Sequence, residues 1–312
     1  MFGKIRVAVW LVALLLGSLG GGVASAQGLG KFSQWSEPVN LGPVINSRFS
    51  QTFSSISRNG LSLYFSSNRP DGFGGPDIWV SQRAGLDAPW GVPQNLGPNI
   101  NTNSADYTPN LSPDGYWMFF SSDRPGGCGG VDIWLAWRLD PEDDFGWELP
   151  GNLGCIMNTP EPDITPAYFE EAETGVVTLY FSSLRPGGLG AFDIYASQLR
   201  RDFFFGSAAL VWELSNPPGA THPAIRHDGL EMFFASSRPG AFGEADLWVS
   251  TRDTARDAWS TPVNLGPLVN TRFYEGGPAL SADGTTLYFY STRPGGFGVF
   301  DIYATYRTRV YE

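Results

Sequence analysis

The sequence predicts an all-β protein, a five-bladed β-propeller of four-stranded antiparallel blades whose ring is closed by the N-terminal strand. Three observations predict this fold: the composition, a segment that recurs five times, and the point in the repeat at which the chain starts and stops. The 312 residues include 39 Gly and 24 Pro, too many helix breakers for a helical bundle, and the 14% aromatic content disfavours disorder.

A Gly-rich loop recurs five times along the chain. Two copies read SSNRPDGFGGPDIW (66–79) and STRPGGFGVFDIY (291–303), and a segment that begins with Trp, such as WSEPVNLGPVIN (35–46), accompanies each copy. Every copy carries an Arg followed eight residues later by an Asp: Arg69 and Asp77, Arg124 and Asp132, Arg185 and Asp193, Arg238 and Asp246, Arg293 and Asp301. Five copies predict five blades. We expect the Arg and Asp of each loop to form an ion pair that fixes the loop.

Each repeat contains four short strand signals in order. The first strand runs into a turn such as SPDG (112–115), and the second is an aromatic and β-branched run such as LSLYFSS (61–67). The third follows the Gly-rich loop, and the fourth begins at the marker Trp. The last copy stops after its third strand, whereas Trp35–Leu41 precedes the first complete blade. We therefore expect Trp35–Leu41 to lie beside Asp301–Arg307 and to leave no open sheet edge.

The first residues predict export. Lys4 and Arg6 precede an apolar run, Val7–Leu19, and small residues at 24–26 follow, a pattern typical of a secretory signal peptide. We divide the chain into a signal peptide, 1–26, and a single propeller domain, 27–312; an uncleaved anchor is the alternative. No later stretch approaches the ~20 apolar residues of a membrane span. We expect a periplasmic or secreted monomer, and the net charge of −11 disfavours nucleic acid as a partner.

The repeat resembles a known family. The SPDG turn, the strand ending in Ser-Ser-x-Arg-Pro-Gly-Gly and the following Asp-Ile-Trp or Asp-Ile-Tyr are similar to the WD40-like β-propeller repeat, PD40, which forms the propeller of periplasmic TolB. The resemblance covers residues 35–309 and implies a propeller fold. It also implies a non-catalytic binding or scaffolding module of the cell envelope, with an envelope protein, peptide or glycan at the mouth of the central channel.

The start of the innermost strands predicts a ligand site at that mouth, on the face that carries the Arg-Asp loops. Corresponding positions of four blades hold Gln51, Asp106, Asp163 and Glu275, and His222 lies nearby in the remaining blade. Converging carboxylates favour a cation, a sugar or an amine. One alternative is that acids here are a repeat consensus that hydrogen-bonds the neighbouring blade. The other is a carbohydrate-active enzyme, a glycoside hydrolase or lyase, that uses Asp106, Asp163 and Glu275.

Cysteine and tryptophan positions complete the expectations. Antiparallel pairing of the third and fourth strands of the second blade places Cys128 nearly opposite Cys155, which predicts a disulfide in an oxidising compartment; two buried thiols are the alternative. Beyond the leader, only Trp117 and Trp137 stand outside the Trp framework of the repeat, and a sugar-stacking platform is the alternative to a core role. We expect no cofactor and no metal, since His and Cys do not cluster.

Overall fold

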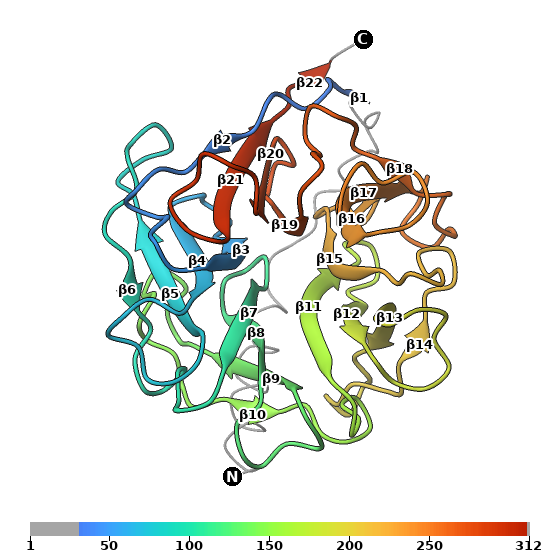
Figure 1. Cartoon of the computed structure of the whole chain (residues 1–312). Helices are drawn as coiled ribbons and strands as arrows, with labels where there is room; N and C mark the ends of the chain where they lie inside the picture. The colour runs from blue at the N-terminus through green and yellow to red at the C-terminus, as the bar shows by residue number, and fades with distance from the viewer. Residues whose placement is uncertain (1–30, 311–312) are drawn as a thin grey trace.

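The computed structural model describes residues 31–310. They form five four-stranded antiparallel sheets, which stand as blades around a central channel, and one two-stranded sheet (Figure 1). This arrangement confirms the five-bladed all-β propeller. The predicted signal peptide lies outside the described residues, and no helix within 31–310 has the length and apolar character needed to cross a membrane.

The blades follow one another along the chain, and we name them A to E. Blade A contains β3 (Gln51–Ile56), β4 (Ser62–Ser67), β5 (Asp77–Gln82) and β6 (Gln94–Asn95). Blade B contains β7 (Asp106–Leu111), β8 (Trp117–Ser122), β9 (Asp132–Trp137) and β10 (Gly151–Asn152). Blade C contains β11 (Asp163–Glu170), β12 (Val177–Ser183), β13 (Asp193–Gln198) and β14 (Ala209–Leu210). Blade D contains β15 (Thr221–Ile225), β16 (Glu231–Ser236), β17 (Asp246–Thr251) and β18 (Val263–Asn264). Blade E contains β19 (Glu275–Leu280), β20 (Thr286–Ser291), β21 (Asp301–Tyr306) and β2 (Val39–Asn40).

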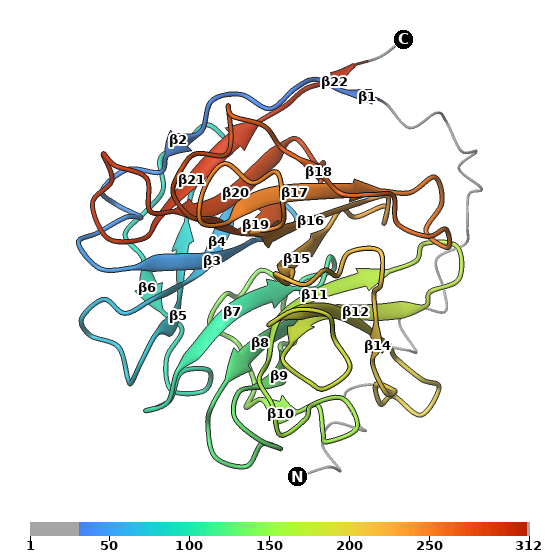
Figure 2. The same ribbon diagram turned by 45° about the vertical axis from the view of Figure 1, so that its right-hand side comes forward.

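The N-terminal strand closes the ring, as the phase of the repeat predicts. In blade E, Val39 of β2 pairs with Ala304 of β21, and the Leu41 N–H donates to the Ile302 carbonyl at 3.1 Å. A second pairing, between β1 (Lys31–Phe32) and β22 (Arg309–Val310), extends this contact beyond the blade (Figure 2). The two ends of the described chain are thus held together by backbone hydrogen bonds, and β21 is covered by β2 as the third strand of each other blade is covered by its fourth.

Apolar side chains fill the space between adjacent blades. Because side chains alternate along a strand, one face of β8 packs toward blade A and the other toward blade C. Met118 and Phe120 belong to the cluster between blades A and B, and Phe119 joins Leu179 in the cluster between blades B and C. Burying one large apolar side chain contributes about 1.5–3 kcal/mol. Layers between blades therefore hold the ring together.

The Arg and Asp of a Gly-rich loop do not pair with each other, which corrects the expected ion pairs. Arg124 instead donates to the Asp106 carboxylate of the innermost strand at 2.5 Å and to Ser122 Oγ at 3.0 Å. Its guanidinium also lies over the Phe120 ring, 4.9 Å from the centroid. The loop Asp, by contrast, reaches outward: Asp132 accepts from the fourth strand's Asn152 Nδ2.

The same separation holds in the other copies. Each loop acid accepts from a backbone N–H of its own loop: Asp77, Asp132, Asp193, Asp246 and Asp301. Each loop arginine donates to a carbonyl of the connection that leads into its blade: Arg69, Arg124, Arg185, Arg238 and Arg293. The physical reason is the hairpin itself, because Arg is anchored on the end of the second strand whereas Asp begins the third. The two side chains leave the loop in opposite directions.

A disulfide joins Cys128 in the Gly-rich loop of blade B to Cys155, just after β10, with a Cα–Cα distance of 5.4 Å. It ties the loop to the connection that leads into blade C. In the other blades the position of Cys128 is held by large apolar residues, Phe73, Leu189, Phe242 and Phe297, so the crosslink is confined to blade B.

Candidate functional site

The predicted channel-mouth residues do not surround a common open volume. The side chains of Asp106, Asp163 and Glu275 are fully buried, and each is paired with the arginine of its own blade. Asp163, for example, lies 2.6 Å from Arg185 and also accepts from Thr159 Oγ1 at 2.9 Å. Each acid therefore ties its blade to the connection that leads into it. Within residues 31–310, no group of three or more His, Cys, Asp or Glu side chains is placed to hold a metal.

The two remaining predicted site residues are also buried. Gln51 is fully buried and donates to Ser47 Oγ at 2.8 Å, so it takes in blade A the place of the carboxylates. His222 lies deeper, in the channel, where its Nδ1 accepts from the Gly277 N–H at 3.3 Å. Burial lowers the pKa of His222 to about 3, so its ring is neutral at physiological pH.

An aromatic plug, formed by Phe53, His222 and Tyr290, closes the channel near its middle. The Phe53 ring lies 5.0 Å from the His222 ring and 5.1 Å from the Tyr290 ring, both edge-on. Each innermost strand has a β-bulge here, and the bulged residue adopts a positive φ, 47° at Phe53 and 59° at His222. In blade E this residue is Gly277, where a Cβ atom would meet the Tyr290 ring at 2.5 Å. The bulge thus aims side chains of several blades at the channel axis.

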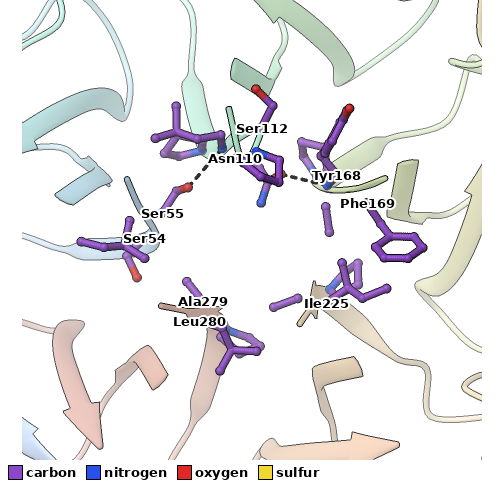
Figure 3. Close-up of a pocket in the computed structure, with 18 of the residues that line it drawn as sticks. Ser54, Ser55, Asn110, Ser112, Tyr168, Phe169, Ile225, Ala279 and Leu280 are labelled. Carbon is purple, nitrogen blue, oxygen red and sulfur yellow. Dashed lines mark hydrogen bonds between the residues drawn. The ribbon is translucent and has the colours of Figure 1, made fainter. Parts of the chain in front are cut away.

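A pocket of about 130 Å³ lies between the plug and the turns that join the first and second strands. It opens at the end of the channel opposite the Gly-rich loops, where Pro113, Glu170 and His227 line it. Figure 3 shows the inner strands around it. The sequence predicts ligand binding at the Gly-rich-loop end, and the structure places the open pocket at the other end. The aromatic plug is the reason, because bulge geometry cannot be read from the repeat pattern.

The pocket wall carries polar side chains in blades A and B and small apolar side chains in blades C, D and E. At one position of the innermost strands the blades carry, in order, Ser55, Asn110, Ala167, Ala224 and Ala279. Ser55 Oγ accepts from the Leu111 N–H at 3.2 Å, and Asn110 Oδ1 accepts from the Tyr168 N–H at 2.9 Å (Figure 3). The alanines supply no acceptor but leave space. Ser54 Oγ, also in the wall, is buried without a hydrogen-bond partner among the described residues.

The rim of the pocket between blades B and C brings two carboxylates near one phenol. Tyr168 Oη donates to Glu170 Oε2 at 3.0 Å, two residues along the same strand. Burial raises the pKa of Tyr168, and the negative charges of Glu170 and of Asp114 raise it further. Asp114 belongs to the β7–β8 turn of blade B, where its Oδ1 accepts from Ser112 Oγ at 2.5 Å and from the Tyr116 N–H at 3.1 Å. Tyr168 therefore stays protonated and serves as a donor.

Comparison with known proteins identifies similar folds. No family model matches the sequence, and no curated protein matches it. An α-L-arabinofuranosidase from Lactobacillus brevis aligns over 87% of this chain and 93% of its own, with TM-score 0.57 and 14% identity. The catalytic domain of a family GH62 α-L-arabinofuranosidase from Coprinopsis cinerea aligns over 90% and 98%, with TM-score 0.59 and 12% identity. A GH43_1 enzyme from Xanthomonas citri, complexed with xylose, aligns over 86% and 89%, with TM-score 0.56 and 15% identity.

These neighbours correct two expectations. They are glycoside hydrolase propellers of families 43 and 62, so the interpretation of the chain as a PD40 repeat protein resembling TolB is wrong. The interpretation that accompanied it, a non-catalytic binding or scaffolding module of the cell envelope, is wrong for the same reason. At this level of identity the likeness establishes the fold alone.

Proposed function

We propose that this chain is a glycoside hydrolase whose site is the open end of the central pocket and the rim between blades B and C. The observation that carries the proposal is the contact of Tyr168 Oη with Glu170 Oε2, 3.0 Å apart, in the lining of an open pocket. Asp114, from the adjacent blade, directly follows Pro113, which also lines that pocket. Hydrolysis of a glycosidic bond commonly uses two carboxyl groups, separated by ~5–9.5 Å, on the two sides of the bond. The acids buried against arginine, Asp106, Asp163 and Glu275, have no access to a substrate.

The two carboxyl groups differ in how they are held. Asp114 accepts two hydrogen bonds inside its turn, whereas Glu170 accepts one, from Tyr168, and lines the pocket. We assign Glu170 as the general acid, next to the bound sugar, and Asp114 as the general base. Glu170 gives its proton to the leaving oxygen as the bond from that oxygen to the anomeric carbon breaks. Asp114 takes a proton from the water whose oxygen bonds to that carbon.

The pocket limits what can enter. Its volume of about 130 Å³ is below the ~150 Å³ of a cavity that holds one benzene molecule, so it admits at most one sugar ring. The Ser55 and Asn110 side chains offer polar contacts on one side, and the alanine side offers apolar contact. The neighbours are named as arabinofuranosidases or hold xylose, which makes pentosides the first substrates to test.

Release of p-nitrophenol from the α-L-arabinofuranoside and the β-D-xyloside, and of reducing ends from arabinoxylan, tests the proposal. We expect activity in the wild type and a fall in kcat/KM of at least about 100-fold in Glu170→Gln and in Asp114→Asn, the usual loss when a general acid or base is removed. Absence of wild-type activity on all three substrates would overturn the proposal, and so would two variants that retain full activity.

Matched controls separate chemistry from folding. Asp283 occupies in blade E the turn position of Asp114 and likewise accepts from its serine, Ser281 Oγ, at 2.6 Å. Asp283→Asn therefore removes the same turn contact in blade E, away from the rim between blades B and C. Glu173, with 83% of its side chain exposed, is the control for Glu170. Both control variants should keep wild-type activity.

A further inference from the structure

Blade B carries a pair of tryptophans that the core does not account for. Trp117, the first residue of β8, is the register partner of Trp137, the last residue of β9, so the two side chains stand side by side on one face of the sheet. Both are partly exposed. They lie at the end of the blade where the pocket opens, because Pro113, in the turn just before Trp117, lines the pocket.

The face that carries the pair is directed at blade C. Trp117 packs against the cluster between blades B and C, and Leu135, which shares a face with Trp137 by alternation, packs against the same cluster. Tyr168 of blade C packs there too, and its ring lies 5.7 Å from that of Phe119. The tryptophan pair and the Tyr168–Glu170 rim therefore lie at the same boundary between the two blades.

No other blade has this pair. The corresponding cross-strand partners are Ser62 and Gln82, Thr178 and Gln198, Glu231 and Thr251, and Thr286 and Tyr306. A packing requirement of the repeat would recur around the ring, as does the aromatic residue four positions before each fourth strand: Trp35, Trp90, Trp147, Phe205 and Trp259. Two large aromatic side chains at one of five equivalent positions therefore indicate a contact with another molecule that blade B alone makes.

We infer that Trp117 and Trp137 form a stacking platform for the sugar rings of a glycan chain that continues outward from the rim site. The inference rests on the proposed function, since the pocket admits at most one ring and the rest of a chain must lie along an adjoining surface. Aromatic faces suit this role because they offer a flat apolar surface, and the indole N–H can still meet a polar partner. The platform borders the rim carboxylates, so a bound chain crosses from one to the other.

Affinity for xylohexaose and for xylobiose, measured by titration calorimetry on the Glu170→Gln background, tests the inference. Trp117→Thr and Trp137→Gln install residues that blade C carries at these positions, Thr178 and Gln198, so the blade should fold. We expect each substitution to weaken xylohexaose binding by at least about tenfold and to change xylobiose binding less than about twofold. Melting curves check that the fold is retained.

Trp212→Ala is the matched control, because Trp212 is 62% exposed but lies in the connection from blade C to blade D, at the Gly-rich-loop end. It should bind xylohexaose as the wild type does. Unchanged xylohexaose affinity in both platform variants would overturn the inference, as would equal weakening of both ligands. If the wild type cleaves aryl pentosides and the platform variants bind xylohexaose normally, only the platform inference fails. If the wild type neither cleaves pentosides nor binds xylohexaose, the proposed function fails as well.

Discussion

Arg138 and Asp144 form a buried ion pair at the boundary of blades A and B, with Nη1 and Oδ1 3.1 Å apart and side chains that are 1% and 3% exposed. Both belong to blade B, but Asp144 also accepts from Ser62 Oγ at 2.6 Å and from Tyr64 Oη at 2.5 Å, in blade A. Burial raises the pKa of Tyr64, and the charge of Asp144 raises it further, so the phenol remains a donor. One carboxylate therefore joins two blades.

Removing this carboxylate should destabilise the ring strongly. In Asp144→Ala, Arg138 keeps its buried charge without a partner, a situation that costs about 3–5 kcal/mol. Urea unfolding followed by tryptophan fluorescence measures the loss in free energy of unfolding. Asp143→Ala changes the exposed neighbouring residue and should cost less than about 1 kcal/mol. Equal stability of the two variants would contradict the structural role of the pair.

His222 should make the protein less stable in mild acid. Its pKa is about 3 in the folded protein and ~6.5 in the unfolded chain, so the unfolded chain binds the proton first as the pH falls. The stability that the neutral ring contributes is complete above pH ~6.5 and is lost progressively between ~6.5 and 3, by at most ~1.4 kcal/mol per pH unit.

His222→Thr tests this effect, because Thr108 and Thr165 occupy the corresponding bulge with φ of 57° and 54°. As the pH falls from 7 to 4, the free energy of unfolding of the wild type should fall relative to that of His222→Thr. His227→Gln, at an exposed position, should follow the wild type. A difference that is independent of pH would mean that His222 takes up its proton inside the folded protein.

Ring closure by β2 should contribute substantially to stability. Deleting residues 31–42 removes β2 together with the pairing of β1 and β22, and leaves β21 as an open edge. We expect a fall in Tm of more than about 10 °C and increased aggregation, since an unpaired edge is a template for further strands. Calorimetry and light scattering measure both effects. A melting curve that matches that of the full chain would show that the ring does not depend on this strand.

The disulfide between Cys128 and Cys155 should stabilise blade B. It closes a loop over a sequence separation of 27 residues, which corresponds to about 3 kcal/mol in the chain-entropy treatment. Reduction, or replacement of both cysteines by serine, should lower the unfolding free energy by an amount of that order. Titration of the denatured, unreduced protein should find no reactive thiol, and two thiols per chain would contradict the crosslink.

The candidate site was only partly predictable. Asp106, Asp163 and Glu275 were identified as a set because they occupy one repeat position, and the structure does place them at equivalent points. Whether such a carboxylate faces a ligand or an arginine depends on a side chain 18 to 22 residues away, Arg124, Arg185 or Arg293. Glu170 was missed because its strand-end position varies between blades. Asp114 was missed because blades D and E also carry Asp at this turn position, Asp228 and Asp283, which is typical of a turn residue. Trp117 and Trp137 were detectable by their departure from the repeat.

The sequence by itself determined the number of blades, their four strands and the closure of the ring by residues near 39–40. The reason is that the period of the repeat, and the point in the repeat at which the chain starts, can be read from the order of the residues alone. It also predicted that Cys128 and Cys155 lie close together, since one precedes and the other follows two paired strands of one blade. Tertiary structure alone decided which end of the channel is open. Phe53, His222 and Tyr290 come from three blades and meet only when the ring is assembled, and their packing closes one end and leaves the pocket at the other.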